Sequence, residues 1–210
     1  MSKPPEPHGA ASSRQAQRSA DMRRRLCQAA IDVLCDVGYE RLSTPLIAAR
    51  AGVSRGAQTH HFPAKADLMV GAFRHLLQSW EEARVATFGT TDPPRVTLET
   101  YLRFAWREIF GKPSYVAALE LMMAARADER LGGQLREALD EWAVRRGAVW
   151  REVLRFSGLR DDDAFQHINM SLLRGMAVHR GFNHAESENE AVLDEWIALV
   201  RHMGVVPPAP

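Results

Sequence analysis

The stretch that decides the fold is TPLIAARAGVS, from Thr44 to Ser54. A hydroxyl residue followed by proline is a common helix start. The hydroxyl caps the first turn, and proline lacks the backbone N–H that would have no hydrogen-bond partner at this position. This predicts a short helix that runs to Ala51 and ends at Gly52, which can adopt the left-handed conformation of a tight turn. Ser54 then caps a second short helix, which ends near Phe62 because a residue before proline is biased away from helix. Two short helices joined by a tight glycine turn form a helix-turn-helix.

The helix after the turn has the sequence RGAQTHH, from Arg55 to His61, and it carries no apolar stripe. A helix that buries no apolar face of its own usually contacts another partner. Ile47, Ala51 and Val53, by contrast, are expected to point into a three-helix core. We therefore expect the Arg55–His61 helix to enter the major groove of double-stranded DNA.

The charge distribution supports a nucleic-acid partner, although the formal net charge of the 210-residue chain is only +1. Residues 1–65 hold ten basic and five acidic residues, so this part carries +5 and the remainder −4. Such an asymmetry is typical of a nucleic-acid-binding module joined to one that does not face nucleic acid. The alternative is chance clustering on a solvated basic face.

The N-terminal third divides into a tail and a domain. Residues 1–20 are rich in Pro, Ser, Ala, Gln and Gly, which predicts a flexible basic tail. From Met22 onward, apolar residues recur at helical spacing, so we expect a helix capped by Asp21 and ended by Gly38. The helix-turn-helix domain is predicted over residues 21–68.

The remaining residues, 69–210, are predicted to form a second, helical domain. A break of Gly, Thr and Pro at residues 89–94 separates a helix that starts near Lys65 from later helical segments. Helical apolar spacing then indicates five segments, at about 95–110, 113–126, 129–157, 161–181 and 188–203. No segment alternates with period two, so the fold class is all-α with about nine helices.

Composition excludes several classes of protein. With 46% hydrophobic and 25% charged residues and two cysteines, the chain is neither disordered throughout nor a disulfide scaffold. The longest apolar run contains Glu120 and is too short to span a membrane. No signal core follows Met1, so we expect a cytoplasmic protein without membrane contact.

The sequence contains no metal-binding or catalytic motif. The side chains of His60 and His61 point in different directions on a helix, and Cys27 and Cys35 lie eight residues apart, which is not the spacing of metal ligands. We expect no metal, no cofactor and no enzyme activity.

The segment from Thr44 to Leu68, with GVSRG at 52–56 and HHFPAKADL at 60–68, resembles the DNA-binding domain of TetR-type transcriptional regulators. Members typically read Gly-Val-Ser-x-Gly-x-Leu-Tyr-x-His-Phe. The resemblance covers residues 22–70, and beyond them it is architectural, with a helical ligand-binding and dimerisation domain. Gln58 and Thr59 differ from the family's usual Leu and Tyr, so the usual DNA contacts need not transfer there.

The resemblance implies roles for residues of the first domain. Arg55, Gly56 and Ala57 would face base edges, where arginine can form a bidentate pair with guanine. The other implied DNA-binding residues are Arg25, Thr44, Pro45, Ser54, Thr59, His60 and Lys65. Arg23, Arg24 and Arg25 are expected at the start of the first helix, where cations are unfavourable unless DNA phosphates neutralise them. A solvated basic turn is the alternative.

The second domain is expected to bind a small apolar or aromatic effector. Most of its large side chains should pack the core, and a few should line a cavity. The candidates are Trp106, Phe110, Glu120, Met122, Met123 and Trp150. Glu120 could be the polar anchor of this site or could face solvent.

The last two helices are expected to form a homodimer interface. Residues 172–177 (LLRGMA) are similar to the penultimate helix that pairs across TetR dimers. A mid-helix glycine costs about 1 kcal/mol relative to alanine, and close approach of another helix would explain Gly175. A four-helix interface is predicted, formed by Leu172, Gly175, Met176, Trp196, Leu199 and Val200.

The sequence therefore predicts a homodimeric, ligand-responsive repressor that a small-molecule effector releases from a palindromic operator. The alternative is a helical enzyme or small-molecule carrier whose N-terminal helices only pack. In that case the Arg55–His61 helix would be an exposed polar element without a purpose.

Overall fold

The computed structural model describes residues 8–90, 95–159, 163–182 and 186–203. Nine α-helices and no β-strand lie in these residues, which confirms the all-α class. The chain divides into two compact units, residues 1–75 and 76–210, and their boundary falls inside α4. The boundary predicted at residue 68 lies near the start of the same helix. The helices are α1 (His8–Arg41), α2 (Thr44–Arg50), α3 (Arg55–His61), α4 (Lys65–Phe88), α5 (Leu98–Ala105), α6 (Pro113–Ala124), α7 (Glu129–Phe156), α8 (Asp163–Arg180) and α9 (Glu186–Met203).

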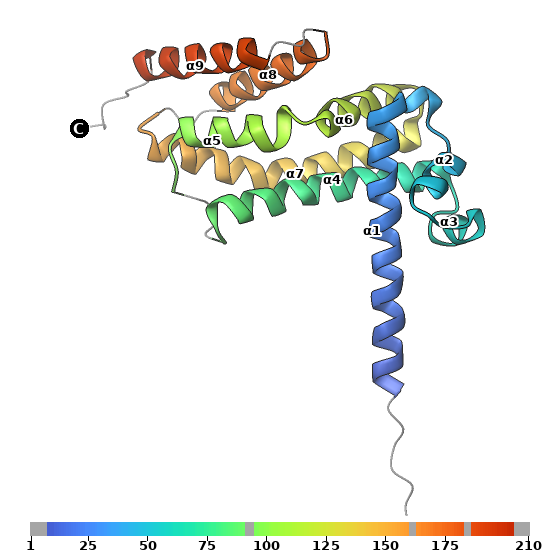
Figure 1. Ribbon diagram of the computed structural model, residues 1–210. Helices are drawn as coiled ribbons and strands as arrows, with labels where there is room; N and C mark the ends of the chain where they lie inside the picture. Colours follow the sequence, from blue (N-terminus) through green and yellow to red (C-terminus); the bar gives the residue numbers. More distant parts are fainter. Residues whose placement is uncertain (1–7, 91–94, 160–162, 183–185, 204–210) are drawn as a thin grey trace, which may run out of the picture. The chain divides into compact units, whose positions relative to one another are not determined.

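In the first unit, α2 and α3 pack beside the C-terminal half of α1 (Figure 1). Its core is made of buried side chains from α1, from α2, from the end of α3 and from the start of α4. These include Leu26, Leu34, Ile47, Phe62 and Leu68. Burying one such side chain contributes about 1.5–3 kcal/mol, so this core holds the short helices against α1.

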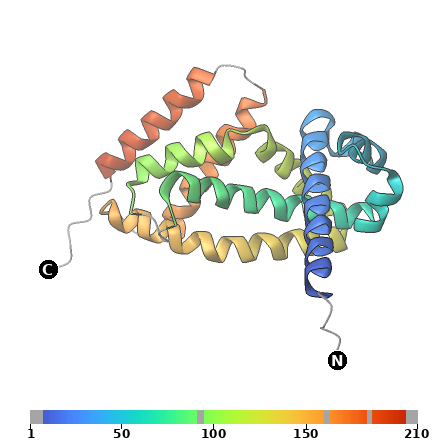
Figure 2. The same ribbon diagram turned by 60° about the horizontal axis from the view of Figure 1, so that its bottom comes forward.

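The first helix is longer than the sequence suggests. α1 begins at His8, so the predicted start at Met22 with Asp21 as its cap is wrong. Side chains from Arg14 to Ala20 are exposed, except the half-buried Ser19, so no apolar stripe marks this part of the helix. Its Ala, Gln and Arg residues are nevertheless good helix formers. The tail predicted for residues 1–20 is therefore helical from His8, and residues 1–7 lie outside the described ranges. Figures 1 and 2 both show this half of α1 extending beyond α2 and α3.

Two glycines and one serine position the helix-turn-helix. Gly38, with φ 74°, interrupts α1 where the sequence predicted its end. Gly52, with φ 62°, makes the turn between α2 and α3, and a residue with a side chain would cost about 1–2 kcal/mol there. Ser54 caps α3, because its hydroxyl oxygen accepts a 3.1 Å hydrogen bond from the backbone N–H of Ala57. The predicted helix-turn-helix is thus confirmed.

In the second unit, aromatic side chains join α4, α5 and α7, which run alongside one another (Figures 1 and 2). The ring centroids are 5.8 Å apart for Trp80–Trp142, 4.9 Å for Phe88–Phe104 and 4.8 Å for Tyr101–Trp150. α8 contacts α6 and α9. Edge-to-face aromatic pairs at these distances stabilise a core beyond the area that they bury.

The helix predicted over 95–110 is α5 followed by a π-helical turn, η1 (Trp106–Phe110). The N–H of Gly111 closes this turn by donating a 2.8 Å hydrogen bond to the carbonyl of Trp106. A Cβ on Gly111 would lie 2.7 Å from that oxygen, so only glycine fits. A short 3-10 turn, η2 (Ala125–Ala127), follows α6. Among the described residues, no helix is long and apolar enough to cross a membrane.

Candidate functional site

The exposed side of α3 is the candidate DNA-binding surface. Arg55, Gly56, Thr59 and His60 are exposed there, and Ala57 is half-buried. Arg55 forms no hydrogen bond or ion pair within the described part of the chain. Its guanidinium has five N–H donors in a planar fork, which suits the two acceptors on the edge of a guanine. The contact residues predicted on this helix therefore share one surface.

Gln58 is on the opposite side of α3, where it is buried. Its Nε2 donates a 2.9 Å hydrogen bond to the carbonyl oxygen of Phe62, at the end of the helix. The sequence showed no apolar stripe on α3, and the one residue of this helix that is buried is indeed polar. A polar residue takes the inward position because this carbonyl satisfies its amide. Gln58 thus belongs to the core, whereas Thr59 remains on the outer surface.

The start of α2 supplies two further predicted contacts. Thr44 is half-buried and Pro45 is exposed, whereas Ile47 and Ala48 are buried against the unit. The first turn of α2 therefore exposes Pro45 and Leu46 and buries the apolar side chains that follow them. Thr44 and Pro45 stay predicted DNA contacts.

The basic run of α1 holds the helix-turn-helix in place. Arg23 donates a 2.7 Å hydrogen bond from Nη1 to the carbonyl oxygen of His61, and Arg25 donates from Nη2 to that of Gly52 at 3.4 Å. Arg24 pairs with Asp21. These arginines lie inside α1 and not at its start, so the predicted conflict with the helix dipole does not arise. Arg23 and Arg25 therefore have protein partners at the end of α3 and in the α2–α3 turn.

Lys65, predicted to bind phosphate, also has partners within the unit. Its Nζ donates a 2.9 Å hydrogen bond to the carbonyl oxygen of Leu42 and lies 4.5 Å from the ring centroid of Tyr39. Burial lowers the pKa of this lysine. The geometry favours a structural role for Lys65, in which it joins the start of α4 to the end of α1.

The six predicted effector-binding residues divide between the interior and the surface. Trp106, Phe110 and Trp150 are buried, and Met122 is half-buried. Glu120 and Met123 are exposed, so within the subunit they do not belong to the interior. α6 is apolar almost throughout, and its sequence therefore does not reveal which side faces inward.

A buried charged cluster in the second unit was missed by the sequence analysis. Glu81 bonds to two arginines, with distances of 2.5 Å from Oε1 to Nη2 of Arg84 and 3.1 Å from Oε2 to Nη1 of Arg146. Both arginine side chains are almost completely buried. Burial alone would raise the pKa of Glu81, but the hydrogen bonds and charges of the two arginines outweigh it and lower the pKa.

Two aromatic donors complete this cluster. The Cζ atom of Arg146 lies 5.5 Å from the ring centroids of both Tyr101 and Trp142. Within the described residues, the buried Tyr101 hydroxyl and Trp142 Nε1 have no hydrogen-bond partner. The sequence did hold a signal: Arg84 and Arg146 each follow a tryptophan by four residues, on the apolar side of a helix.

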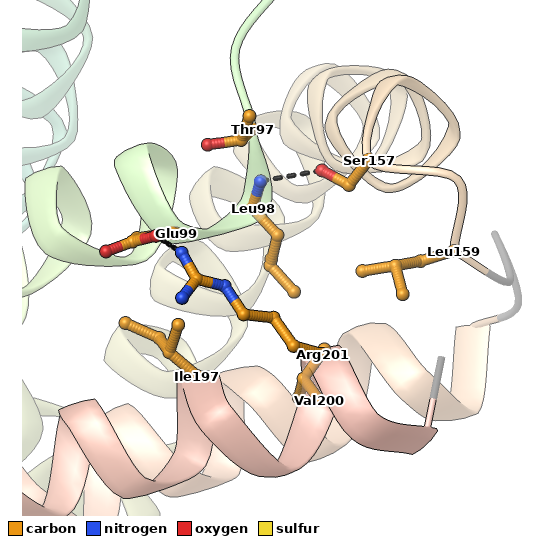
Figure 3. Close-up of a pocket in the computed structure, with 8 residues that line it drawn as sticks. All are labelled: Thr97, Leu98, Glu99, Ser157, Leu159, Ile197, Val200 and Arg201. Carbon is orange, nitrogen blue, oxygen red and sulfur yellow. Dashed lines mark hydrogen bonds and ion pairs between the residues drawn. The ribbon is translucent and has the colours of Figure 1, made fainter. Parts of the chain in front are cut away.

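A separate pocket of about 260 Å³ lies between the start of α5, the end of α7 and α9 (Figure 3). Leu98 donates a 2.7 Å backbone hydrogen bond to the Ser157 hydroxyl there, and Arg201 reaches across to Glu99. Its lining residues are Thr97, Leu98, Glu99, Ser157, Leu159, Ile197, Val200 and Arg201. None of the predicted effector-binding residues lines this pocket.

The six residues predicted to form the dimer interface also differ in how exposed they are. Gly175 and Leu199 are exposed, and Leu172 and Trp196 are half-buried. Met176 and Val200 are buried within their own unit, at 5% and 3% exposure, so they serve its core. Four further apolar side chains are exposed along or beside the same helices, namely Ile168, Val178, Phe182 and Val192.

A three-helix unit with a tight glycine turn, a capped second helix and an outward polar side defines a helix-turn-helix DNA-binding protein. The family model for bacterial regulatory proteins of the tetR family matches residues 26–72. The HTH-type transcriptional regulator CymR of Pseudomonas putida is 29% identical over 189 residues, which cover 89% of this chain and 93% of CymR. An uncharacterised HTH-type transcriptional regulator of Mycobacterium tuberculosis is 34% identical over 131 residues, which cover 62% of this chain and 67% of that regulator. The chain belongs to the tetR family of bacterial regulatory proteins, a family of DNA-binding transcriptional regulators and not of enzymes.

Solved structures agree with this assignment. The multidrug binding protein EbrR, complexed with imidazole, superposes with a TM-score of 0.60 at 25% identity and covers 90% of this chain and 93% of its own. A transcriptional regulator from Rhodococcus sp. Rha1 superposes with a TM-score of 0.69 at 22% identity and covers 89% of this chain and 99% of its own. The likeness to the Rhodococcus regulator supports the fold alone.

Proposed function

We propose that the protein is a homodimeric, cytoplasmic transcriptional repressor that releases a palindromic operator when a small organic effector binds its second unit. The observation that carries this proposal is the exposed side of α3, with Arg55 available for an external acceptor. Membership of a family of DNA-binding regulators supports it.

In this proposal each subunit places α3 in the major groove. Arg55 pairs with a guanine, and Gly56 and Ala57 let the helix approach the base edges closely. Thr44, Thr59 and His60 contact phosphates, which position the helix without reading sequence. Two-fold symmetry then puts the half-sites about 34–36 Å apart, or a multiple of that distance.

Exposed apolar stripes on α8 and α9 support the homodimer. On α8 the stripe comprises Ile168, Leu172 and Gly175 and continues to Phe182, which is 84% exposed just after the helix. On α9, Val192, Trp196 and Leu199 recur at spacings of four and three residues. Stripes of this kind are typical of helices that pack against another helix. We propose that a second copy covers both, in an isologous four-helix interface.

The effector acts by favouring one of two conformations of the dimer. In the released conformation, the two α3 helices no longer match the half-site spacing. The effector can shift this equilibrium only by its difference in affinity for the two conformations. EbrR is named a multidrug binding protein and was solved with imidazole and with proflavin, both ring compounds. This supports a ring-containing effector for the present chain.

Transcript levels test the direction of regulation. In a strain that lacks this gene, genes that carry the bound site should be transcribed more, and restoring the wild-type gene should reverse the rise. A variant that lacks the Arg55 side chain serves as the control and should not reverse it. A fall in transcription on deletion would show an activator, and unchanged transcription would contradict the proposal.

A further inference from the structure

We infer that the effector is an aromatic monocarboxylate, whose carboxylate binds Arg146 together with the Tyr101 hydroxyl and the Trp142 indole N–H. This inference rests on the proposed function, because it names the chemical class of the compound that the second unit binds. It concerns the cluster of Glu81, Arg84, Tyr101, Trp142 and Arg146.

Two buried donors of the cluster lack an acceptor within the described residues. Tyr101 is 0% exposed, and neither its hydroxyl nor Nε1 of Trp142 has a hydrogen-bond partner in the described part of the chain. A buried polar group without a partner lowers the stability of the fold. An indole N–H can only donate, so an occupant of this site has to present an acceptor.

The charged groups of the cluster also bear on the class of ligand. Arg146 lies 5.5 Å from the rings that bear both donors, and Glu81 bonds to both Arg146 and Arg84. Within the described residues the cluster thus includes two guanidinium groups and the carboxylate of Glu81. A site that combines two guanidinium groups with a hydroxyl donor and an indole donor favours an anion over a cation, because charges interact strongly where water is excluded. An acceptor with a negative charge, such as a carboxylate, fits both the donors and the charge.

Aromatic side chains surround the donors of the cluster. Trp150 packs edge-to-face against Tyr101, and Trp80 does so against Trp142. An aromatic ring attached to the carboxylate would therefore meet aromatic neighbours, with which such rings pack favourably. The Glu81 side chain is 32% exposed and Trp142 is half-buried, so the cluster reaches the surface of the unit at these two residues.

Paired acids and amides test this inference on the full-length protein. We would titrate it with benzoate, phenylacetate and 1-naphthoate, each beside its uncharged amide, and with choline as a cationic probe. Calorimetry and the shift in melting temperature measure binding. At least one acid should bind about tenfold more tightly than its amide. The proposal is overturned if no acid binds, if acids and amides bind equally well, or if choline binds more tightly.

Two tyrosine variants distinguish binding from a structural role. Tyr101→Phe removes a hydroxyl without a partner, so it should leave or raise the melting temperature of the free protein and weaken acid binding about fivefold. Tyr115→Phe is the matched control, because Tyr115 is buried in the same unit but is not one of the five residues of the cluster. It should leave acid binding unchanged. The reverse pattern would contradict the inference.

DNA binding is measured in parallel, so that the two proposals fail separately. Binding of an acid without any binding of duplex DNA would refute the repressor and leave the ligand site standing. Specific DNA binding by a protein that takes up none of the acids would refute the ligand class alone.

Discussion

Arg23 of α1 donates a 2.7 Å hydrogen bond from Nη1 to the carbonyl oxygen of His61, the last residue of α3. The same guanidinium lies 4.2 Å from the ring centroid of Phe62. One end of α3 is therefore tied to α1 by a charged donor, while Arg25 contacts the turn at its other end. These bonds help to fix the orientation of α3 on α1, and with it the side of α3 that we propose faces DNA.

Arg55 should determine base preference. Arg55→Ala is expected to weaken binding to the preferred site by about 1–3 kcal/mol and to relax selection at one base pair per half-site, because it removes a bidentate contact. Binding to the preferred duplex and to single-base variants measures this. Arg41→Ala controls for the loss of one exposed positive charge in the same unit and should keep the preference. Unaltered selectivity of Arg55→Ala would show that Arg55 does not read a base.

Gly56 should separate DNA binding from stability. Its Cβ would lie 3.9 Å from the Ser54 hydroxyl, an ordinary contact, and alanine is favoured over glycine in helices by about 0.5–1 kcal/mol. Gly56→Ala should therefore unfold at higher urea concentration than the wild type. The added methyl group should nevertheless weaken DNA binding, because it stands between α3 and the base edges. If binding stays at wild-type strength, Gly56 does not face the groove.

Lys65 is expected to stabilise the fold more than it binds phosphate. Lys65→Met keeps most of the apolar stem but removes the bond to the Leu42 carbonyl, so it should lower the free energy of unfolding by about 1–2 kcal/mol. The slope of log affinity against log salt should stay as in the wild type. A slope that flattens by about 0.9 would instead count Lys65 among the phosphate contacts.

Gly175 tests the dimer. A Cβ on Gly175 meets nothing within 4 Å in its own subunit, so Gly175→Leu should leave the subunit folded. At a close contact between helices of two copies, the larger side chain should hold them apart, and sedimentation should show a weaker dimer. Gly147→Leu is the matched control, because its Cβ also meets open space, on α7. Equal dimer affinity in both variants would remove α8 from the interface.

Local signals in the sequence were sufficient for the helix-turn-helix, because Gly52 and Ser54 act through their own backbone and neighbouring residues. Tertiary position was harder to predict. Gln58 is buried because a carbonyl at the end of its helix pairs with it, and sequence spacing does not show that bond. α1 extends to His8, although no apolar stripe marks the residues from Arg14 to Ala20. The charged cluster was missed because Arg84 and Arg146 pair with a carboxylate on another turn or another helix.

Selection from a pool of random duplex DNA tests the central claim most directly. The purified, folded and dimeric protein should retain duplexes that share a two-fold-symmetric site, with half-sites about 34–36 Å apart or at a multiple of this distance. Such a site would also provide a probe for the compounds that release the protein. No enrichment at low salt, with or without the aromatic acids present, would contradict the account.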